Sequence, residues 1–323
     1  QSAELTKIKE EFPQYKEIHS TILQGVLGRV DKAFQGFFRR IKISKDGCGF
    51  PRYKGKDRFK SICYTQSGFD FTKDKKRIAL SKIGFVKITL SRPIPIDAKM
   101  KTCTIKQEAN HWYCVLCCDI PSVIKEKVVV KNIVGIDLGL TDFAVLSNGE
   151  EIANPKYLKQ SEAKLKERQS EYSKNRTKEK KKQLVKLHRK VANQRRDFQH
   201  KTSKTLVDRF DLIAYEDLNV KGMMKDSKYN LNKHIGDASW GTFVAMLKYK
   251  AEEAGKYAIA INPKGTSQKC SNCGAIVKKD LYERTHSCLC GFVATRDYNA
   301  AINILASGID ACRHTESPCF SLG

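Results

Sequence analysis

The sequence predicts a mixed α/β fold preceded by a mostly-β unit, and three observations lead to this prediction. Short β-rich runs punctuated by Asp, Gly and Pro fill residues 46–130. Apolar, buried-type strands recur in the second half, and two of them end in the carboxylates Asp137 and Glu216. Between these two strands lies a long segment of helix-favouring composition, residues 156–209, without Gly or Pro.

Composition indicates a polyanionic partner. The 323 residues are enough for two or three units, and 60 Lys and Arg stand against 35 Asp and Glu, a net charge of +25. Such a surplus makes an extended polyanion the default partner. Because we find no run of 18 or more apolar residues and no secretory signal in residues 1–30, we expect a soluble, intracellular protein without a membrane partner.

The first part of the chain is expected to carry a helix on a β-rich unit. Apolar residues recur at three- and four-residue steps over residues 18–38, which is the stripe of an amphipathic helix. We place a partial helical region at residues 1–45 and the β unit at 46–130. The chain begins at Gln1, inside a helical pattern, and we therefore expect it to be a fragment that lacks part of an N-terminal region.

A second unit is predicted from residue 131. An apolar strand over residues 133–136 comes first, and the next strands form a hairpin that turns at Asn148 and Gly149. Residues 156–209 then carry nineteen Lys and Arg against six acids. A solvated helical hairpin is one interpretation of this charge run, and a phosphate-binding surface is the one we favour, because a merely solvated face mixes its charges. A helix over 240–254 and a final helix over 297–305 follow.

Three carboxylates are candidate metal ligands. Asp137 and Glu216 end apolar strands, and Asp297 opens the final helix, so an α/β fold can bring them together. Hard oxygen ligands of this kind select Mg²⁺ or Mn²⁺, and two such ions about 4 Å apart activate water and stabilise a leaving oxygen in phosphodiester hydrolysis. Each residue also has a purely structural explanation, such as a strand-end cap, an ion-pair partner or a helix N-terminal acid.

The segment "GIDLG" around Asp137 also matches the first phosphate loop of actin-like ATPases. That chemistry requires a second Asp-Gly-Gly type phosphate loop downstream, and the sequence contains none.

Four of the twelve cysteines have metal-ligand spacing. Cys270 and Cys273 are followed, after fourteen residues, by Cys288 and Cys290. Two tight turns that each present a pair of thiolates to a tetrahedral Zn²⁺ explain this pattern better than disulfides or free thiols. The second pair is one residue shorter than usual, which leaves His286 as a possible substitute ligand.

These motifs together resemble the TnpB family. The resemblance is carried by "GIDLGL", "AYEDLNVKGM", "TSQKCSNCG" and "CGFVATRDYNAAINIL". It implies a RuvC-type RNase H-like nuclease domain in residues 131–262 and 296–306, with an inserted zinc ribbon at 263–295 that binds target nucleic acid. It also implies a wedge-like β-barrel upstream and a disordered tail at 307–323.

The resemblance further implies the chemistry and partners of the chain. It makes Asp137, Glu216 and Asp297 the catalytic, Mg²⁺-binding triad, and it makes the quartet a structural zinc site. The expected function is an RNA-guided DNA endonuclease of a transposable element, acting in the prokaryotic cytosol or nucleoid. A guide RNA encoded by the element would select a double-stranded DNA target by base pairing. A cleavage-inactive nucleic-acid-binding regulator and a strand-transfer transposase are the alternatives.

Overall fold

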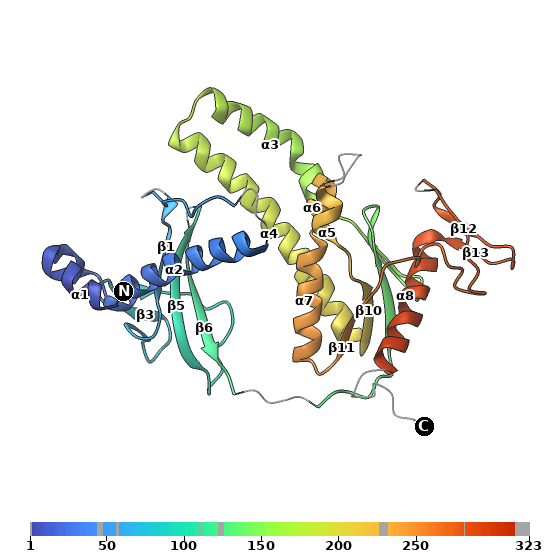
Figure 1. Ribbon diagram of the computed structural model, residues 1–323, viewed down its shortest axis with the longest axis horizontal. Coiled ribbons are helices and arrows are strands. Elements are labelled where there is room, and N and C mark those ends of the chain that lie inside the picture. The colour runs from blue at the N-terminus through green and yellow to red at the C-terminus, as the bar shows by residue number, and fades with distance from the viewer. Residues whose placement is uncertain are drawn as a thin grey trace. The chain divides into compact units, whose positions relative to one another are not determined.

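The structure is a computed structural model that comprises two compact units, Gln1–Val123 and Ile124–Gly323 (Figure 1). The residues that the structure describes are 2–43, 48–55, 58–109, 111–121, 126–225, 232–280 and 282–313.

The first unit consists of helices packed on small antiparallel sheets. Its elements are α1 (Ser2–Glu11), η1 (Pro13–Glu17), α2 (Ser20–Ile43), β1 (Ser61–Tyr64), β2 (Phe69–Phe71), β3 (Arg77–Leu80), β4 (Gly84–Lys87), β5 (Lys99–Glu108) and β6 (His111–Asp119). Helix α2 corresponds to the predicted amphipathic helix. Its Ile22 is buried in one core with Tyr64 of β1 and Leu80 of β3, so α2 attaches directly to the β-rich part.

The six strands of this unit form two sheets of three strands. The orders are β1-β5-β6 and β2-β3-β4, with antiparallel pairing throughout. Side chains from both sheets, including Ile78 and Cys103, share the core. Among the described residues, backbone pairing joins no strand of one sheet to a strand of the other, so the expected barrel takes the form of two packed sheets.

The second unit is built on a five-stranded mixed sheet of order β11-β10-β7-β8-β9. Its strands are β7 (Ile133–Leu138), β8 (Asp142–Leu146), β9 (Glu151–Ala153), β10 (Leu212–Glu216) and β11 (Tyr257–Ile261). Strand β10 runs parallel to both β7 and β11, whereas β7, β8 and β9 pair antiparallel. The predicted turn between β8 and β9 is confirmed: Gly149 has a φ of +88°, which glycine adopts without steric cost.

Helices cover both faces of this sheet, as Figure 1 shows for α7 and α8. The helices are α3 (Tyr157–Lys174), α4 (Lys178–Arg209), α5 (Val220–Lys225), α6 (Asn232–Ala238), α7 (Trp240–Glu253) and α8 (Arg296–Arg313). On one face, Leu206 of α4 and Phe243 of α7 pack against alternate residues of β7 and β10. On the other face, Ile304 of α8 packs against Leu212 and Ala214. No helix within the described ranges is long and apolar enough to cross a membrane.

Helix α8 lies unusually close to the sheet at two glycines. A Cβ placed on Gly135 of β7 would stand 2.2 Å from the carbonyl oxygen of Ala301, and one on Gly308 would stand 2.3 Å from the Cβ of Ala214. Real Cβ contacts are never this short, so both positions require glycine for space. The two close contacts hold α8 flat against β7 and β10.

We therefore expect Gly135→Ala to destabilise the second unit by about 1–3 kcal/mol, because the added methyl group forces backbone apart rather than displacing a flexible side chain. Chemical denaturation of the full chain measures this change. Gly241→Ala in α7 is the matched control, since a Cβ there meets nothing within 4 Å. The control should be neutral or slightly stabilising, and equal effects of the two substitutions would contradict the steric explanation.

Helix α8 is longer than the sequence indicated. The predicted final helix ended at Leu305, and residues from 307 onward were expected to form a disordered tail. The structure corrects this prediction, because the helix continues to Arg313. The extra turns are stabilised by burial of Gly308 and Cys312 against the sheet. The rest of the predicted tail, residues 314–323, lies outside the described residues.

Candidate functional site

Two of the candidate carboxylates lie on neighbouring strands and face the same side of the sheet. In β7, Ile136 packs on the α4 and α7 face, so Asp137 faces the α8 side. In β10, Tyr215 packs on the α4 and α7 face, so Glu216 also faces α8. Tyr215 is paired with Ile136 in the parallel register, and the two acids are the next residues along each strand. Both therefore stand at the carboxyl ends of adjacent parallel strands.

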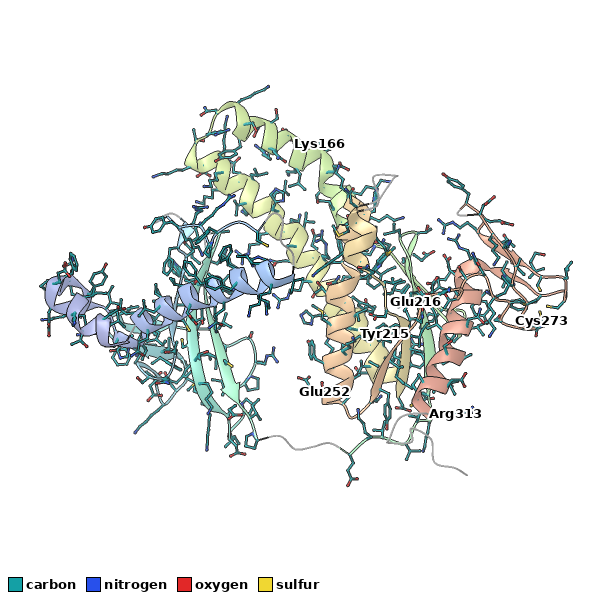
Figure 2. All side chains as sticks on the ribbon, viewed as in Figure 1. Lys166, Tyr215, Glu216, Glu252, Cys273 and Arg313 are labelled. Atoms are coloured by element: carbon teal, nitrogen blue, oxygen red, sulfur yellow. The ribbon has the colours of Figure 1, made fainter. Side chains whose placement is uncertain are left out.

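The third carboxylate reaches the same place from the start of α8. Asp297 is in the first turn of that helix, directly after β13 (Val293–Thr295). Its side chain lies 3.5 Å from Arg296 Nε and 3.9 Å from Arg284 Nη1. Figure 2 shows Glu216 on the sheet beside α8. The three acids predicted from sequence thus come from three separate segments, and Glu216 and Asp297 lie near enough to Asp137 for their charges to act on it.

The electrostatics of Asp137 show that these carboxylates interact. Burial, followed by the negative charges of Glu216 and Asp297, raises the pKa of Asp137 to about 8, although Arg296 opposes the increase. Burial also raises the pKa of Glu216 above its usual range. A place where burial disfavours the ionised forms of two neighbouring carboxylates, Asp137 and Glu216, is one where a bound cation is strongly favoured.

The donor chemistry of the cluster fits a hard divalent cation. Every candidate ligand is a carboxylate, and oxygen-only sets suit Mg²⁺ or Mn²⁺ rather than Zn²⁺. The nearby Arg284 and Arg296 pair with Asp297, and Arg296 also favours the ionised form of Asp137.

Sequence reasoning missed a polar residue that contacts Glu216 and the two asparagines that hold its loop. The hydroxyl of Thr266 donates to Glu216 Oε1 at 2.5 Å and opposes the rise in its pKa. Two buried asparagines of α8 hold the loop that carries Thr266. The side-chain amide of Asn303 donates a hydrogen bond to the carbonyl of Thr266, and that of Asn299 donates one to the carbonyl of Lys269. The available signal was the spacing of these asparagines: two amides four residues apart in an otherwise apolar helical pattern share one face.

The four cysteines form a compact cluster at the base of a small hairpin. The Sγ atoms of Cys270, Cys273, Cys288 and Cys290 all lie within 4.8 Å of one another. Cys270 and Cys288 are buried, and Cys273 and Cys290 are exposed. The hairpin strands β12 (Thr285–Ser287) and β13 pair antiparallel and lead directly into α8. In Figure 2, Cys273 lies to one side of α8, in the stretch of chain that precedes β12.

Tight turns explain how the shortened second pair still converges. Gly274 N–H donates to the carbonyl of Cys270, and Gly291 N–H donates to the carbonyl of Cys288. Both glycines have positive φ, +78° and +85°, which L residues rarely adopt. The backbone N–H of Phe292, followed by the amide of Asn272, lowers the pKa of Cys290 to about 6, so its thiolate form is favoured.

His286 is not a member of the cysteine cluster. Its ring is fully buried, and Nδ1 contacts Lys279 Nζ. The group of converging ligand atoms within the described residues consists of the four thiols alone. Four cysteines therefore suffice as a ligand set, and the shortened spacing does not call for a histidine substitute.

Two family models match the chain across the site. The model OrfB_IS605, described as "Probable transposase", matches residues 114–227, which include Asp137 and Glu216. The model described as "Cas12f1-like, TNB domain" matches residues 240–304, which include the cysteine quartet and Asp297. Together the two models extend over both parts of the acidic cluster.

Curated relatives align over most of the chain. A Streptomyces pristinaespiralis protein, named as a candidate RNA-guided DNA endonuclease, is 35% identical over 96% of this chain and 77% of its own length. TnpB-like protein L770 of Acanthamoeba polyphaga mimivirus is 32% identical over 70% of this chain and 46% of its own length.

The fold is also found in a solved structure. A cryo-EM structure of a Cas12f1–sgRNA–target DNA complex contains a chain with a TM-score of 0.52 and 17% identity to this one. The similarity covers 88% of this chain and 71% of that chain, and it shows a shared α/β fold. The motif resemblance, the family models and the relatives agree, and the chain belongs to the TnpB family.

Proposed function

We propose that this protein is an RNA-guided, Mg²⁺-dependent DNA endonuclease of a transposable element, with Asp137, Glu216 and Asp297 as its metal-binding catalytic triad. The observation that carries the proposal is the action of two carboxylate charges, those of Glu216 and Asp297, on the carboxylate of Asp137, which lies on a separate segment. Such a cluster has no structural benefit of its own, because its members repel one another and lose hydration.

The architecture supports a RuvC-type RNase H-like assignment for the second unit. The sheet combines parallel strands β7, β10 and β11 with antiparallel β8 and β9, and helices lie on both faces. Two carboxylates stand at strand ends and the third on the covering helix α8. This arrangement supports the triad that the TnpB resemblance leads us to expect.

Asp137, Glu216 and Asp297 would hold Mg²⁺ or Mn²⁺. When bound there, the ion supplies activation of water and stabilisation of the leaving oxygen in phosphodiester hydrolysis. The protein's own contribution is to present three oxygen donors from rigid elements. Arg296 and Arg284 lie beside Asp297 and provide positive charge near the path of a phosphate backbone.

The cysteine quartet would hold a structural Zn²⁺. Four thiolates complete a tetrahedral site and leave no open position for chemistry. The cluster closes a segment of few buried apolar side chains, in which Ile276, Leu289 and Val293 are exposed. A metal is the natural source of stability for such a segment, which we interpret as a zinc ribbon that contacts target nucleic acid.

The basic hairpin of α3 and α4 provides a surface for phosphates. It extends away from the sheet of its unit (Figure 1) and carries exposed cations such as Lys181, Lys182, Lys186 and Lys190. Nineteen Lys and Arg between residues 156 and 209 exceed the acids there by thirteen, so ion pairing within the hairpin cannot neutralise them. The proposed partners of this surface are a guide RNA encoded by the element and its double-stranded DNA target.

The proposal is tested by expressing the full chain together with its native flanking DNA in a prokaryotic host and sequencing the RNA that co-purifies. We expect one discrete RNA species that ends in variable sequence. The purified complex should then cut double-stranded DNA matching that variable sequence when Mg²⁺ is present, leave 5′-phosphate ends, and stop when EDTA is added.

The alternatives give different results in the same experiment. A discrete RNA and tight DNA binding without Mg²⁺-dependent products would favour a nucleic-acid-binding regulator. Products in which a donor DNA end is joined to the target would favour strand transfer. Random cellular RNA with no guided cutting would contradict the proposal itself.

A further inference from the structure

We propose that Thr266 is a positioning residue for Glu216, and that Asn299 and Asn303 anchor its loop to α8, so that the cysteine cluster and the acidic site share one hydrogen-bonded frame. The inference rests on the proposed function only in taking Glu216 as a metal ligand.

The first step is the contact between Thr266 and the carboxylate. Thr266 Oγ1 lies 2.5 Å from Glu216 Oε1 and 3.1 Å from the carbonyl oxygen of Pro263. A hydroxyl has one proton to donate, and the shorter contact to a charged acceptor is the stronger bond. Glu216 is a buried side chain at the last residue of β10. A bond to Oε1 fixes its rotamer and leaves Oε2 for a cation.

The second step is the attachment of the Thr266 loop to α8. The side-chain amide of Asn303 donates to the carbonyl of Thr266 at 2.8 Å and to the carbonyl of Lys269 at 2.7 Å. Asn299 donates to the same Lys269 carbonyl at 2.8 Å. Both asparagines are buried: Asn299 is 0% exposed and Asn303 is 9% exposed. Buried amides with all these partners satisfied rigidify the segment they bind.

The third step links this frame to the cysteine cluster. Asn299 accepts a hydrogen bond from the backbone N–H of Ser271 at 2.9 Å, and Ser271 directly follows Cys270. Asn299 is also only two residues beyond Asp297 on α8. A shift of the Cys270 turn therefore moves the loop of Thr266 and the helix of Asp297 together.

Asparagine is the residue that this arrangement requires. Asn299 uses its Nδ2 as a donor and its Oδ1 as an acceptor, and Asn303 uses one amide group to serve two carbonyls. An aspartate at either position would place an anionic oxygen against a carbonyl oxygen, and an apolar residue would leave the carbonyls without partners.

The test compares cation affinity in the full chain by electron paramagnetic resonance with Mn²⁺ as the probe. Thr266→Val keeps the side-chain shape and loses the hydroxyl, and we expect it to weaken Mn²⁺ binding about 10-fold or more, as loss of a bond to a ligating side chain does elsewhere. Thr266→Ser keeps the hydroxyl and should stay within about 3-fold of the wild type. Thr242→Val, on the exposed surface of α7, is the matched control.

The anchoring role of α8 is tested by a double-substitution cycle. Asn303→Ala should weaken Mn²⁺ binding in the same direction as Thr266→Val. The combined variant should be hardly weaker than Thr266→Val alone, because both act through one loop. Circular dichroism checks that each variant is folded, and simple additivity would overturn the shared frame.

Glu216→Gln separates this inference from the proposed function. If Glu216→Gln weakens Mn²⁺ binding and Thr266→Val does not, the positioning role is overturned while the metal site stands. If Glu216→Gln binds Mn²⁺ as the wild type does, the triad proposal is overturned together with the role of Thr266. Weakening in both variants, with recovery in Thr266→Ser, is the expected result.

Discussion

Asp137→Asn is expected to abolish DNA cleavage while it raises the stability of the metal-free protein. The amide cannot supply the anionic oxygen that a hard divalent cation requires, so we expect guided cleavage to fall by about 10³-fold or more. Binding of guide RNA should persist, because Asp137 is one partly buried residue at a strand end and contributes no phosphate-binding charge.

The gain in stability follows from the electrostatics of the site. Burial and the charges of Glu216 and Asp297 raise the pKa of Asp137 to about 8, well above its value in an unfolded chain. The folded state therefore binds a proton more tightly than the unfolded state, and metal-free stability falls as pH rises from about 4 toward 8. Asp137→Asn removes this cost and should gain about 1–3 kcal/mol at pH 8.

Two measurements check this prediction. Cleavage of a matched DNA target is followed with the complex formed by each variant, and calorimetry of the metal-free chain is recorded between pH 5 and 8. Asp208→Asn is the control, since Asp208 is an exposed acid paired with Lys204. Retained cleavage in Asp137→Asn, or a pH dependence as steep as that of the wild type, would exclude the role we assign to Asp137.

Cys270→Ser is expected to remove structural metal from the ribbon and to reduce cleavage as a consequence. Cys270 is 1% exposed, and its Sγ lies 3.8 Å from that of Cys290. A serine hydroxyl is a poor zinc ligand, so affinity for Zn²⁺ should fall by about 10²-fold or more. Because structural zinc sites contribute folding free energy directly, the segment around the cluster should lose its protection from proteolysis.

The effect should reach the acidic site through the backbone next to Cys270. Ser271 N–H is bonded to Asn299, and Asn299 holds the loop that carries Thr266. Zinc content is measured by mass spectrometry of the native complex, together with limited proteolysis and cleavage. Cys117→Ser is the control, since Cys117 is exposed and lies in the first unit. One zinc ion per chain in Cys270→Ser would contradict the four-thiolate site.

Much of the second unit could be predicted from sequence because its elements are marked by local patterns. Strands β7 and β10 are continuous apolar runs, and Asn148 and Gly149 mark the hairpin between β8 and β9. The fold of the first unit was harder to predict from the sequence. Its strands were recognisable, but which strands pair into which sheet depends on contacts between distant segments, and the expected barrel formed two sheets.

The sequence by itself determined the chemistry available to this protein: three acids suited to a hard cation, four thiols at zinc spacing and a large surplus of positive charge. Residue type and short spacing are local properties, so they can be read from the sequence without a structure. That the acids share one site was a prediction from fold class, and their catalytic role remains a proposal.

Only the tertiary structure decided how these groups meet. The close contact of α8 with Gly135 brings Asp297 over the strand ends, and the turn at Gly291 lets a shortened cysteine pair converge. The bonds of Thr266 and Asn303 to residues far away in the chain complete the frame. These features arise from packing between segments, and apart from the four-residue spacing of Asn299 and Asn303, neither periodicity nor spacing along the chain carries a signal for them.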